Sequence, residues 1–377
     1  MNHRHYEYDG KEFIQFYLND DTTVEDTLAL KQMGFLLCKK TEKEISIGSD
    51  FYCAQVEIEW DDDRLEALLN VFDFFKKKNL LWCSLRMAVR SLENYGRFTR
   101  QIIRHVNVLG LFKELDLTFE EDLDEGENLF PSVTLNNRLE VLKIVSSDHT
   151  EMSEEDMNSL GHLLQTTSTL KWLELKKAGY LHNRALLRGL AGNQTLERIC
   201  IFPNDGCLVD SDFAKLLESI SRIPSLRKFH LMYYKLGHLS SKALEKLLED
   251  SMLHTLILFT TSKAIHETRN MMKTKTLVQG MKKTSSLRTL SITGDVFCDP
   301  LPFSKILSGV SSCPSLKTLK LRYLELTKED FEQAILVEKL PHPIVLRLEC
   351  LYSEHEEEIQ KLRQSHPEIQ VIIEKEE

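Results

Sequence analysis

The stretch Leu316-Lys317-Thr318-Leu319-Lys320-Leu321 decides the fold, because its pattern L-x-x-L-x-L returns about every 29 residues along the chain. The pattern is equally clear at Leu170, Leu173 and Leu175. A fixed period of about 20 to 50 residues is typical of a solenoid, in which no unit buries its own apolar side and neighbouring units must stack. The sequence therefore predicts one elongated array of short units rather than two or three globular domains.

Each unit starts with an apolar residue, and further apolar residues follow three and five positions later. The starting positions are Cys53, Leu80, Phe112, Leu139, Leu170, Leu196, Leu226, Leu253, Leu287, Leu316 and Pro343, and an incomplete unit is expected at Ile369 and Ile372. The last two apolar positions of a unit are two residues apart, so they point to the same side of a short strand. Strands of this kind, lying side by side, predict a parallel sheet with a buried column of leucines.

Helical apolar spacing fills the segments between the strands. It is clear over residues 64–72 and at Phe213, Leu216, Leu217 and Ile220. Helix starts are expected at Asp210-Ser211-Asp212, at Ser240-Ser241, and at Thr327 ahead of Asp330, while Pro224, Pro314 and Pro341 mark helix ends. Each unit is therefore expected to contain a strand, a turn, a helix and a return to the next strand.

This alternating unit resembles the leucine-rich repeat of the ribonuclease-inhibitor-like subtype, over roughly residues 50–373. The resemblance implies an α/β solenoid, or horseshoe, of about 11–12 repeats, with parallel strands on the concave face and helices on the convex face. That family favours Asn or Cys three residues after the third apolar position. Asn204 fits this preference, whereas Ser147 and Tyr234 depart from it.

Residues 1–50 lack the repeat and predict an N-terminal cap with a helix near residues 24–37, since a terminal unit must cover the exposed edge of the stack. Residues 51–377 are expected to form the solenoid. A helix over residues 354–364 and a strand over residues 369–373 are expected to close it.

Composition excludes several classes of function. The net charge of −10 and the pI near 5.8 argue against a nucleic-acid-binding protein. The first residues are polar and predict no secretory signal, and no apolar run approaches the length of a membrane span. The 8 cysteines are dispersed and form no C-x-x-C motif, which favours reduced thiols. We therefore expect a cytoplasmic protein, with the nucleus as the alternative, and no membrane partner.

Catalytic and ligand-binding motifs are missing from the sequence. It contains no phosphate-cradling G-x-x-x-x-G-K, no G-x-S-x-G and no H-E-x-x-H. The 13 histidines are scattered, and no two are three or four residues apart, as a pair of metal ligands on a helix would be. The sequence therefore predicts a protein that is not an enzyme and that uses no cofactor or metal.

The positions between the leucines are the candidate binding residues, because alternate residues of a strand point away from the leucine column. Aromatic side chains there are favoured anchors for a protein partner. The charged positions change from acidic in early units, which include Glu57 and Glu59, to basic in later ones. The partner-binding candidates are Trp82, Glu114, Asp116, Trp172, Arg198, Lys228, His230, Tyr233, Phe259, Lys320, Arg322 and Arg347. The simpler alternative is that these residues are only solvated, or that the aromatic ones pack against each other.

The function expected from these observations is a protein-interaction scaffold that binds a protein partner through its concave face. Three alternatives come from the resemblance: a substrate-recognition subunit of an F-box-type ubiquitin ligase, a regulator or inhibitor of an enzyme such as a ribonuclease or small GTPase, and the sensor region of an innate-immune receptor. The acidic run at residues 120–127 is interpreted as a solvated loop, with a docking element as the alternative. Partner identity and oligomeric state stay open.

Overall fold

The computed structural model describes residues 3–8, 11–16, 35–41, 44–49, 69, 73, 81–89, 101, 104–105, 108, 110, 112–119, 137–146, 154–178, 181–203, 209–233, 237–260, 274–293, 303–322, 326–349 and 355–374. It divides into two compact units, Met1–Tyr180 and Leu181–Glu377. We call them unit 1 and unit 2 and describe each by itself. The expected boundary near residue 50 stays a prediction.

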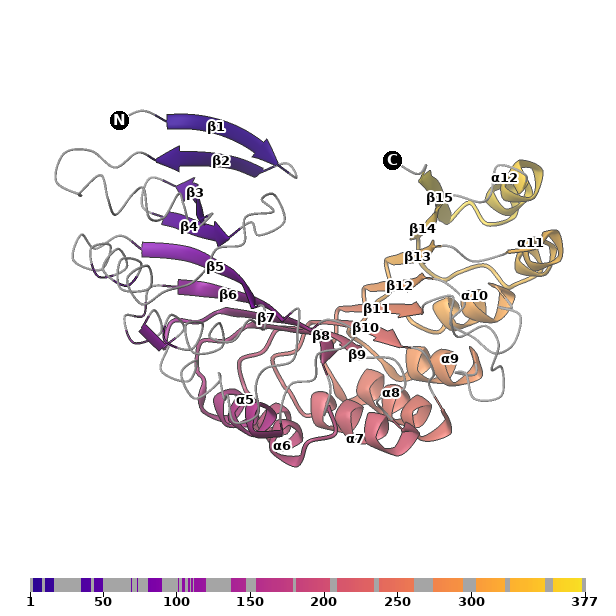
Figure 1. Ribbon diagram of the computed structural model, residues 1–377. Helices are drawn as coiled ribbons and strands as arrows, with labels where there is room; N and C mark the ends of the chain where they lie inside the picture. The colour runs from indigo at the N-terminus through magenta and orange to yellow at the C-terminus, as the bar shows by residue number, and fades with distance from the viewer. Residues whose placement is uncertain are drawn as a thin grey trace. The chain divides into compact units, whose positions relative to one another are not determined.

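The described part of unit 1 contains two sheets. The first pairs β1 (His3–Tyr8) with β2 (Lys11–Phe16) in antiparallel fashion. In the second sheet the strands follow chain order, and only its first pair is antiparallel. Its strands are β3 (Phe35–Thr41), β4 (Glu44–Ser49), β5 (Leu81–Val89), β6 (Phe112–Phe119), β7 (Val141–Ser146) and β8 (Trp172–Ala178). Helix α5 (Glu154–Thr166) connects β7 to β8 and lies on one face of this sheet (Figure 1).

The beginning of unit 1 differs from the sequence prediction. Residues 35–37, expected at the end of a helix, belong to strand β3, because a short apolar run does not distinguish helix from strand by its periodicity. The parallel neighbour of β5 is β4, while the repeat expected from Cys53 lies outside the described residues. Leu85 pairs with Leu115, so the pattern in β5 is two residues later than predicted. A shift of two residues keeps the same side chains on the same face.

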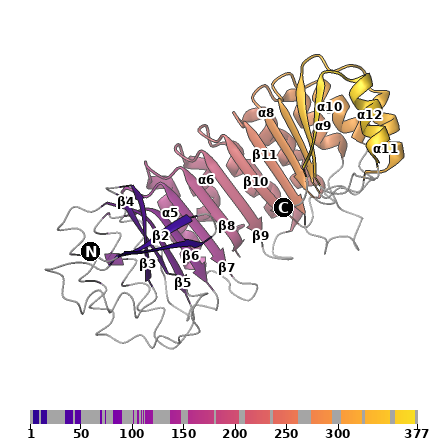
Figure 2. The same cartoon turned by 90° about the horizontal axis from the view of Figure 1, so that it is seen from above.

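Unit 2 is a parallel sheet whose strands also follow chain order (Figure 2). The strands are β9 (Arg198–Pro203), β10 (Lys228–Tyr233), β11 (Thr255–Thr260), β12 (Thr289–Thr293), β13 (Thr318–Arg322), β14 (Ile344–Glu349) and β15 (Ile369–Glu374). The helices are α6 (Arg184–Gly192), α7 (Asp210–Ser221), α8 (His238–Asp250), α9 (Thr274–Lys283), α10 (Phe303–Ser311), α11 (Lys328–Ile335) and α12 (Glu356–Ser365). All these helices lie on one face of the sheet (Figure 1). We call the opposite face of each unit its open face.

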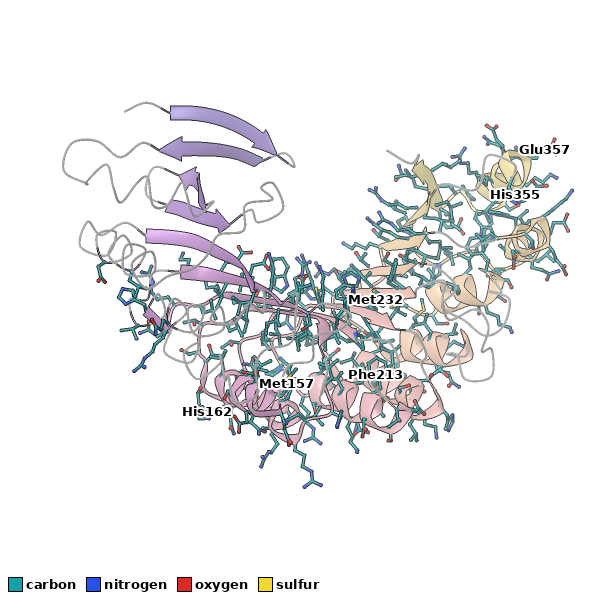
Figure 3. All side chains as sticks on the ribbon, viewed as in Figure 1. Met157, His162, Phe213, Met232, His355 and Glu357 are labelled. Atoms are coloured by element: carbon teal, nitrogen blue, oxygen red, sulfur yellow. The ribbon has the colours of Figure 1, made fainter. Side chains whose placement is uncertain are left out.

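The core of unit 2 lies between the strands and the helices. Leu256, Leu290, Leu319 and Leu346 pair in register and are fully buried, so they form the predicted leucine column. The helices contribute the other side of the core, as Phe213 of α7 does (Figure 3). Such burial stabilises the fold by about 1.5–3 kcal/mol for each large apolar side chain. The same burial fixes which residues of each strand face outward.

A second set of contacts between repeats uses hydroxyl groups that the sequence pattern did not reveal. The residue before the first leucine of a repeat is often Ser or Thr. Its hydroxyl donates a hydrogen bond to the backbone carbonyl of the first leucine of the preceding repeat. These bonds are Thr169 to Leu139 at 2.9 Å, Ser225 to Leu196 at 2.7 Å and Ser286 to Leu253 at 2.9 Å. They satisfy buried carbonyl groups and fix the register of successive repeats.

For one helix, the start expected from the sequence is two residues later than the observed start. Helix α8 begins at His238 rather than at Ser240-Ser241, because Asp210 of the preceding repeat caps it. The carboxylate of Asp210 accepts hydrogen bonds from the backbone N–H groups of Leu239 at 2.9 Å and Ser240 at 3.0 Å, and from the Ser240 hydroxyl. Burial opposes ionisation of Asp210, but these hydrogen bonds outweigh it and lower the pKa of its carboxyl.

Other predicted boundaries are confirmed. Thr327 and Asp330 form a reciprocal capping box at the start of α11.

In the last strand Val371, rather than Ile372, continues the leucine column, and Ile372 lies beside Arg347 in the open-face row. The alternation of parallel strands with helices confirms the predicted α/β leucine-rich-repeat solenoid.

Candidate functional site on the open face

The open face of unit 2 carries alternate strand residues in rows that run across the sheet. The middle row is Cys200, His230, Ile257, Ser291, Lys320, Arg347 and Ile372, each paired in register with the next. Neighbouring members of such a row are about 4.8 Å apart, since that is the spacing of hydrogen-bonded strands. The rows therefore bring together side chains that are some 30 positions apart in the chain.

On β9 to β11 this face is apolar and aromatic beyond Arg198 and Lys228, which begin β9 and β10. The rings of Phe202 and His230 meet edge to face, with their centroids 4.8 Å apart. Met232 pairs in register with Phe259, and both are half-buried. Figure 3 labels Met232 in this strand layer. Aromatic and methionine side chains that are ordered but partly exposed suit contact with a protein partner.

The part of this face on β13 and β14 is basic. Lys320 pairs in register with Arg347, and Arg322 lies two residues further along β13. All three side chains are half-buried. Ser291 and Thr293 separate them from the apolar part and are buried although they belong to the open face.

Acidic side chains are absent from the open face of unit 2 among the side chains that the structure describes. Five cationic side chains occupy it: Arg198, Lys228, Lys320, Arg322 and Arg347. Glu349 and Glu374 continue the row that contains Arg322, and only their backbone is described. The described part of this face is therefore positively charged.

A further row of basic residues precedes the strands of unit 2. The backbone N–H of His254 donates to the carbonyl of Arg227, that of Arg288 to His254 and that of Lys317 to Arg288, each at 2.8 Å. We call Arg227, His254, Arg288 and Lys317 the basic edge row; Glu197 occupies the same position on the preceding repeat. Burial and the charges of Arg288 and Arg227 lower the pKa of His254.

This row was not among the predicted binding residues, although its signal is present in the sequence. These residues occupy the second position of L-x-x-L-x-L, directly after the first leucine, whereas only the third, fifth and seventh positions were considered. Reading the second position down successive units gives Arg, His, Arg and Lys.

The open face of unit 1 is also charged, but its charges pair with each other. The ammonium group of Lys143 forms an ion pair with Glu114 and lies 4.6 Å from the centroid of the Trp172 ring. Glu174 and Lys176 lie on the same strand as Trp172, and the Lys176 ammonium is 2.6 Å from the Glu174 carboxylate. The predicted anchor Trp172 is therefore half-buried and in contact with a lysine of its own unit.

The edge row of unit 1 alternates in sign. Its members are Lys113, Glu140 and Lys171, joined by the same backbone hydrogen bonds as in unit 2. The Glu140 carboxylate lies 3.7 Å from the Lys113 ammonium and 3.6 Å from the Lys171 ammonium. This row is therefore neutralised within the unit.

Except for Tyr233, which continues the alternation of the buried Phe229 and Leu231, the predicted binding residues fall on the open faces as the period of two requires. Asp116 lies on β6 between Arg86 and Lys143, and Arg198 lies beside Lys228. For Trp82 and Tyr233 the structure describes the backbone alone, and Glu57, Glu59 and the acidic run at 120–127 lie outside the described residues. The partner-binding role of all these residues stays a prediction.

Two further features are absent from the described residues. No group of three or more His, Cys, Asp or Glu side chains in these ranges is arranged to hold a metal ion. Within the same ranges, no helix is both long enough and apolar enough to cross a membrane.

The described parts of the chain have the fold of a leucine-rich-repeat solenoid, and their repeats resemble the ribonuclease-inhibitor-like subtype. No protein-family model matches the chain, and no curated protein matches it in sequence. Among solved structures, a chain of the yeast Rad7 and Elc1 complex is 20% identical, with a TM-score of 0.44, over 80% of this chain and 74% of that chain. The leucine-rich repeat-containing protein LegL7 from Legionella pneumophila is 15% identical, with a TM-score of 0.46, over 77% of this chain and 91% of that chain. These likenesses concern the fold alone.

Proposed function

We propose that this protein is a non-enzymatic interaction scaffold that binds a protein partner through the open face of unit 2. The supporting observation is the combination on that face of an apolar and aromatic part with five cationic side chains, and of no described acidic side chain. Interfaces favour aromatic, methionine and arginine side chains, and this face supplies all three kinds.

The mechanism of binding is rigid presentation. The backbone of each strand is hydrogen-bonded to its neighbours, and the buried leucine column holds the opposite side of every strand. The outward side chains are therefore placed before a partner arrives, so that little ordering of the backbone opposes association. Unit 1, whose charges are paired internally, is proposed to support the scaffold rather than to supply the main contacts.

Affinity purification of the full chain tests this function. The variant Lys228→Glu with Lys320→Glu reverses two charges on the open face, while the control Lys242→Glu with Lys305→Glu reverses two exposed lysines on helices α8 and α10. We expect protein partners retained by the wild type and by the control to be lost with the open-face variant. Retention of every partner by the open-face variant would show that the binding surface lies elsewhere.

The ubiquitin-ligase, enzyme-regulator and immune-sensor alternatives stay predictions from the resemblance. Identification of the partners retained by the control variant would separate them, because each implies a different kind of partner.

A further inference from the structure

We propose that the basic edge row of unit 2, Arg227, His254, Arg288 and Lys317, binds a carboxylate-rich segment of the protein partner. This inference rests on the proposed function, because it specifies the chemistry of that partner. It adds four residues that lie outside the alternating open-face positions and that the leucine pattern alone did not select.

The backbone fixes these four residues in line. Arg227 donates its N–H to the carbonyl of Glu197, and each of the other three donates to the carbonyl of the one before it, so the row advances by one strand spacing per residue. At about 4.8 Å per strand the row spans about 14 Å, the length of four to five residues of extended chain. A short acidic segment that crosses the strands therefore meets all four side chains.

The charges of the row act on each other. Burial and the positive charges of Arg288 and Arg227 lower the pKa of His254. Arg227 is oriented by hydrogen bonds from its guanidinium group to the carbonyls of Pro224 at 3.1 Å and Leu226 at 3.0 Å. Arg288 and Lys317 are exposed. A carboxylate placed there would relieve the repulsion between like charges.

The open face extends this field. Lys228 follows Arg227 directly, is exposed and pairs in register with Arg198. Threonine residues 255, 289 and 318 each follow a member of the row and are half-buried, so a hydroxyl group accompanies each of those charges. Hydroxyl groups can donate hydrogen bonds to carboxylate oxygens as well.

Unit 1 provides an internal comparison for this inference. Its row has the same backbone hydrogen bonds, but Glu140 lies between Lys113 and Lys171 and pairs with both. Unit 2 has His254 and Lys317 at the positions where a row that alternates after Arg227 would have a carboxylate. The geometry of the repeat is the same in both units, so the difference comes from the side chains alone.

An acidic protein segment fits this row better than a nucleic acid does. The positive charges are spread along a line, one per strand, which suits several separate carboxylates. The row contains no Phe, Tyr or Trp side chain on which a base would stack. The whole chain carries a net charge of −10, which would repel a long polyanion.

Fluorescence anisotropy of a labelled octapeptide with alternating Glu and Ser tests the proposal on the full-length protein. We expect saturable binding that weakens at least several-fold when salt is raised from about 50 to 300 mM, because exposed charges are screened. A matched peptide with Gln in place of Glu should not bind. The variant Arg288→Glu with Lys317→Glu should bind the acidic peptide roughly 10-fold or more weakly.

The control variant is Lys171→Glu, which reverses an exposed charge at the same position of a repeat in unit 1. We expect it to change peptide affinity by less than about twofold. Circular dichroism of each variant would confirm that it folds.

Three results would overturn the inference: equal binding of the Glu and Gln peptides, unchanged affinity in the Arg288→Glu with Lys317→Glu variant, or tighter binding of a single-stranded oligonucleotide of equal charge. If partners are still lost from the open-face variant while the acidic peptide does not bind, the proposed function stands and this inference fails. If the control and open-face variants retain the same partners, the proposed function fails independently of the peptide.

Discussion

The edge rows of the two units occupy the same position of the repeat and use the same backbone hydrogen bonds. Their charges differ, because the row of unit 1 alternates in sign and the basic edge row of unit 2 does not. In unit 1, Glu140 lies between two lysines and neutralises them. In unit 2, four successive residues are basic. The comparison shows that the repeat fixes where side chains lie and leaves their chemistry free.

The energetic consequences of this difference are small for folding and large for binding. Exposed ion pairs such as those of Glu140 contribute about 0–1 kcal/mol each. A row of like charges costs similar small amounts, which the buried leucines of the same strands easily offset. For a partner, however, the unpaired row is a source of attraction and faster association.

The largest expected effect breaks the scaffold that both rows share. Leu142 in unit 1 and Leu290 in unit 2 are fully buried members of the leucine columns. Replacing either by Ala should cost about 2–5 kcal/mol of unfolding free energy, because a cavity replaces the lost side chain. Urea denaturation followed by circular dichroism measures this cost. A loss below about 1 kcal/mol at Leu290 alone would mean that its column is less tightly packed than that of unit 1.

A second effect is confined to unit 2. A methyl group on Gly237 would meet the Asp210 carboxylate at 2.3–2.6 Å, so Gly237→Ala should displace the cap of helix α8. We expect a loss of about 1–2 kcal/mol, comparable to that of Asp210→Ala, which removes the same cap. Thermal denaturation of both variants and of the double variant checks this, since two changes that remove one interaction should not add.

The cap also predicts a dependence on pH. The folded pKa of Asp210 is below its ordinary value of 3.8, so its contribution to stability is present above that value and is lost as pH falls through the folded pKa. The difference in unfolding free energy between the wild type and Asp210→Asn should therefore shrink as pH falls below about 4. A difference that stayed constant down to pH 2 would contradict the cap.

A smaller effect is expected when the edge row of unit 1 is given the charges of the edge row of unit 2. The substitution Glu140→Lys makes the edge row of unit 1 uniformly basic, like that of unit 2. We expect a second, weaker site for the acidic octapeptide, and a stability loss of only a few tenths of a kcal/mol, because the pairs are exposed. Binding stoichiometry by isothermal titration calorimetry measures the first effect. Glu140→Gln, which removes the pairs without adding charge, is the matched control.

The smallest effect is on His254. Its pKa lies below the ordinary value of 6.5, with burial and two arginine charges as the causes. Arg288→Glu replaces one of these positive charges by a negative one, so the pKa of His254 should rise towards or above 6.5. An NMR titration of the imidazole protons measures this shift. An unchanged pKa would show that His254 and Arg288 do not interact.

Stability linked to His254 has the opposite sign from an ordinary histidine that gains a partner. A histidine with a lowered folded pKa binds protons more weakly in the folded state than in the unfolded state. Its favourable contribution is therefore present above pH 6.5 and is lost as pH falls through the folded pKa.

Much of the fold was predictable from the sequence, because the leucine pattern recurs with little variation. The columns through Leu319 and Leu321, the boundary at Thr327 and the ends near Pro224 and Pro314 all follow from local chemistry. The start of unit 1 was predicted less well. An apolar run such as residues 35–38 fits helix or strand, and only its pairing with β4 decides between them.

The candidate site was predicted in part. A period of two places Lys320 and Arg347 on the open face without any knowledge of the structure. The period does not reveal which charges neutralise each other. Lys143, for example, pairs with Glu114 and lies over the ring of Trp172.

The sequence by itself determined the repeat, the parallel strands and the side of each strand that is buried, because these depend on residues within one repeat. The tertiary structure alone decided which repeats contact each other and through which atoms. Asp210 caps a helix 29 residues away, and Ser225 bonds the carbonyl of Leu196. Arg227, His254, Arg288 and Lys317 become a continuous row only when stacking places residues of separate repeats one strand spacing apart.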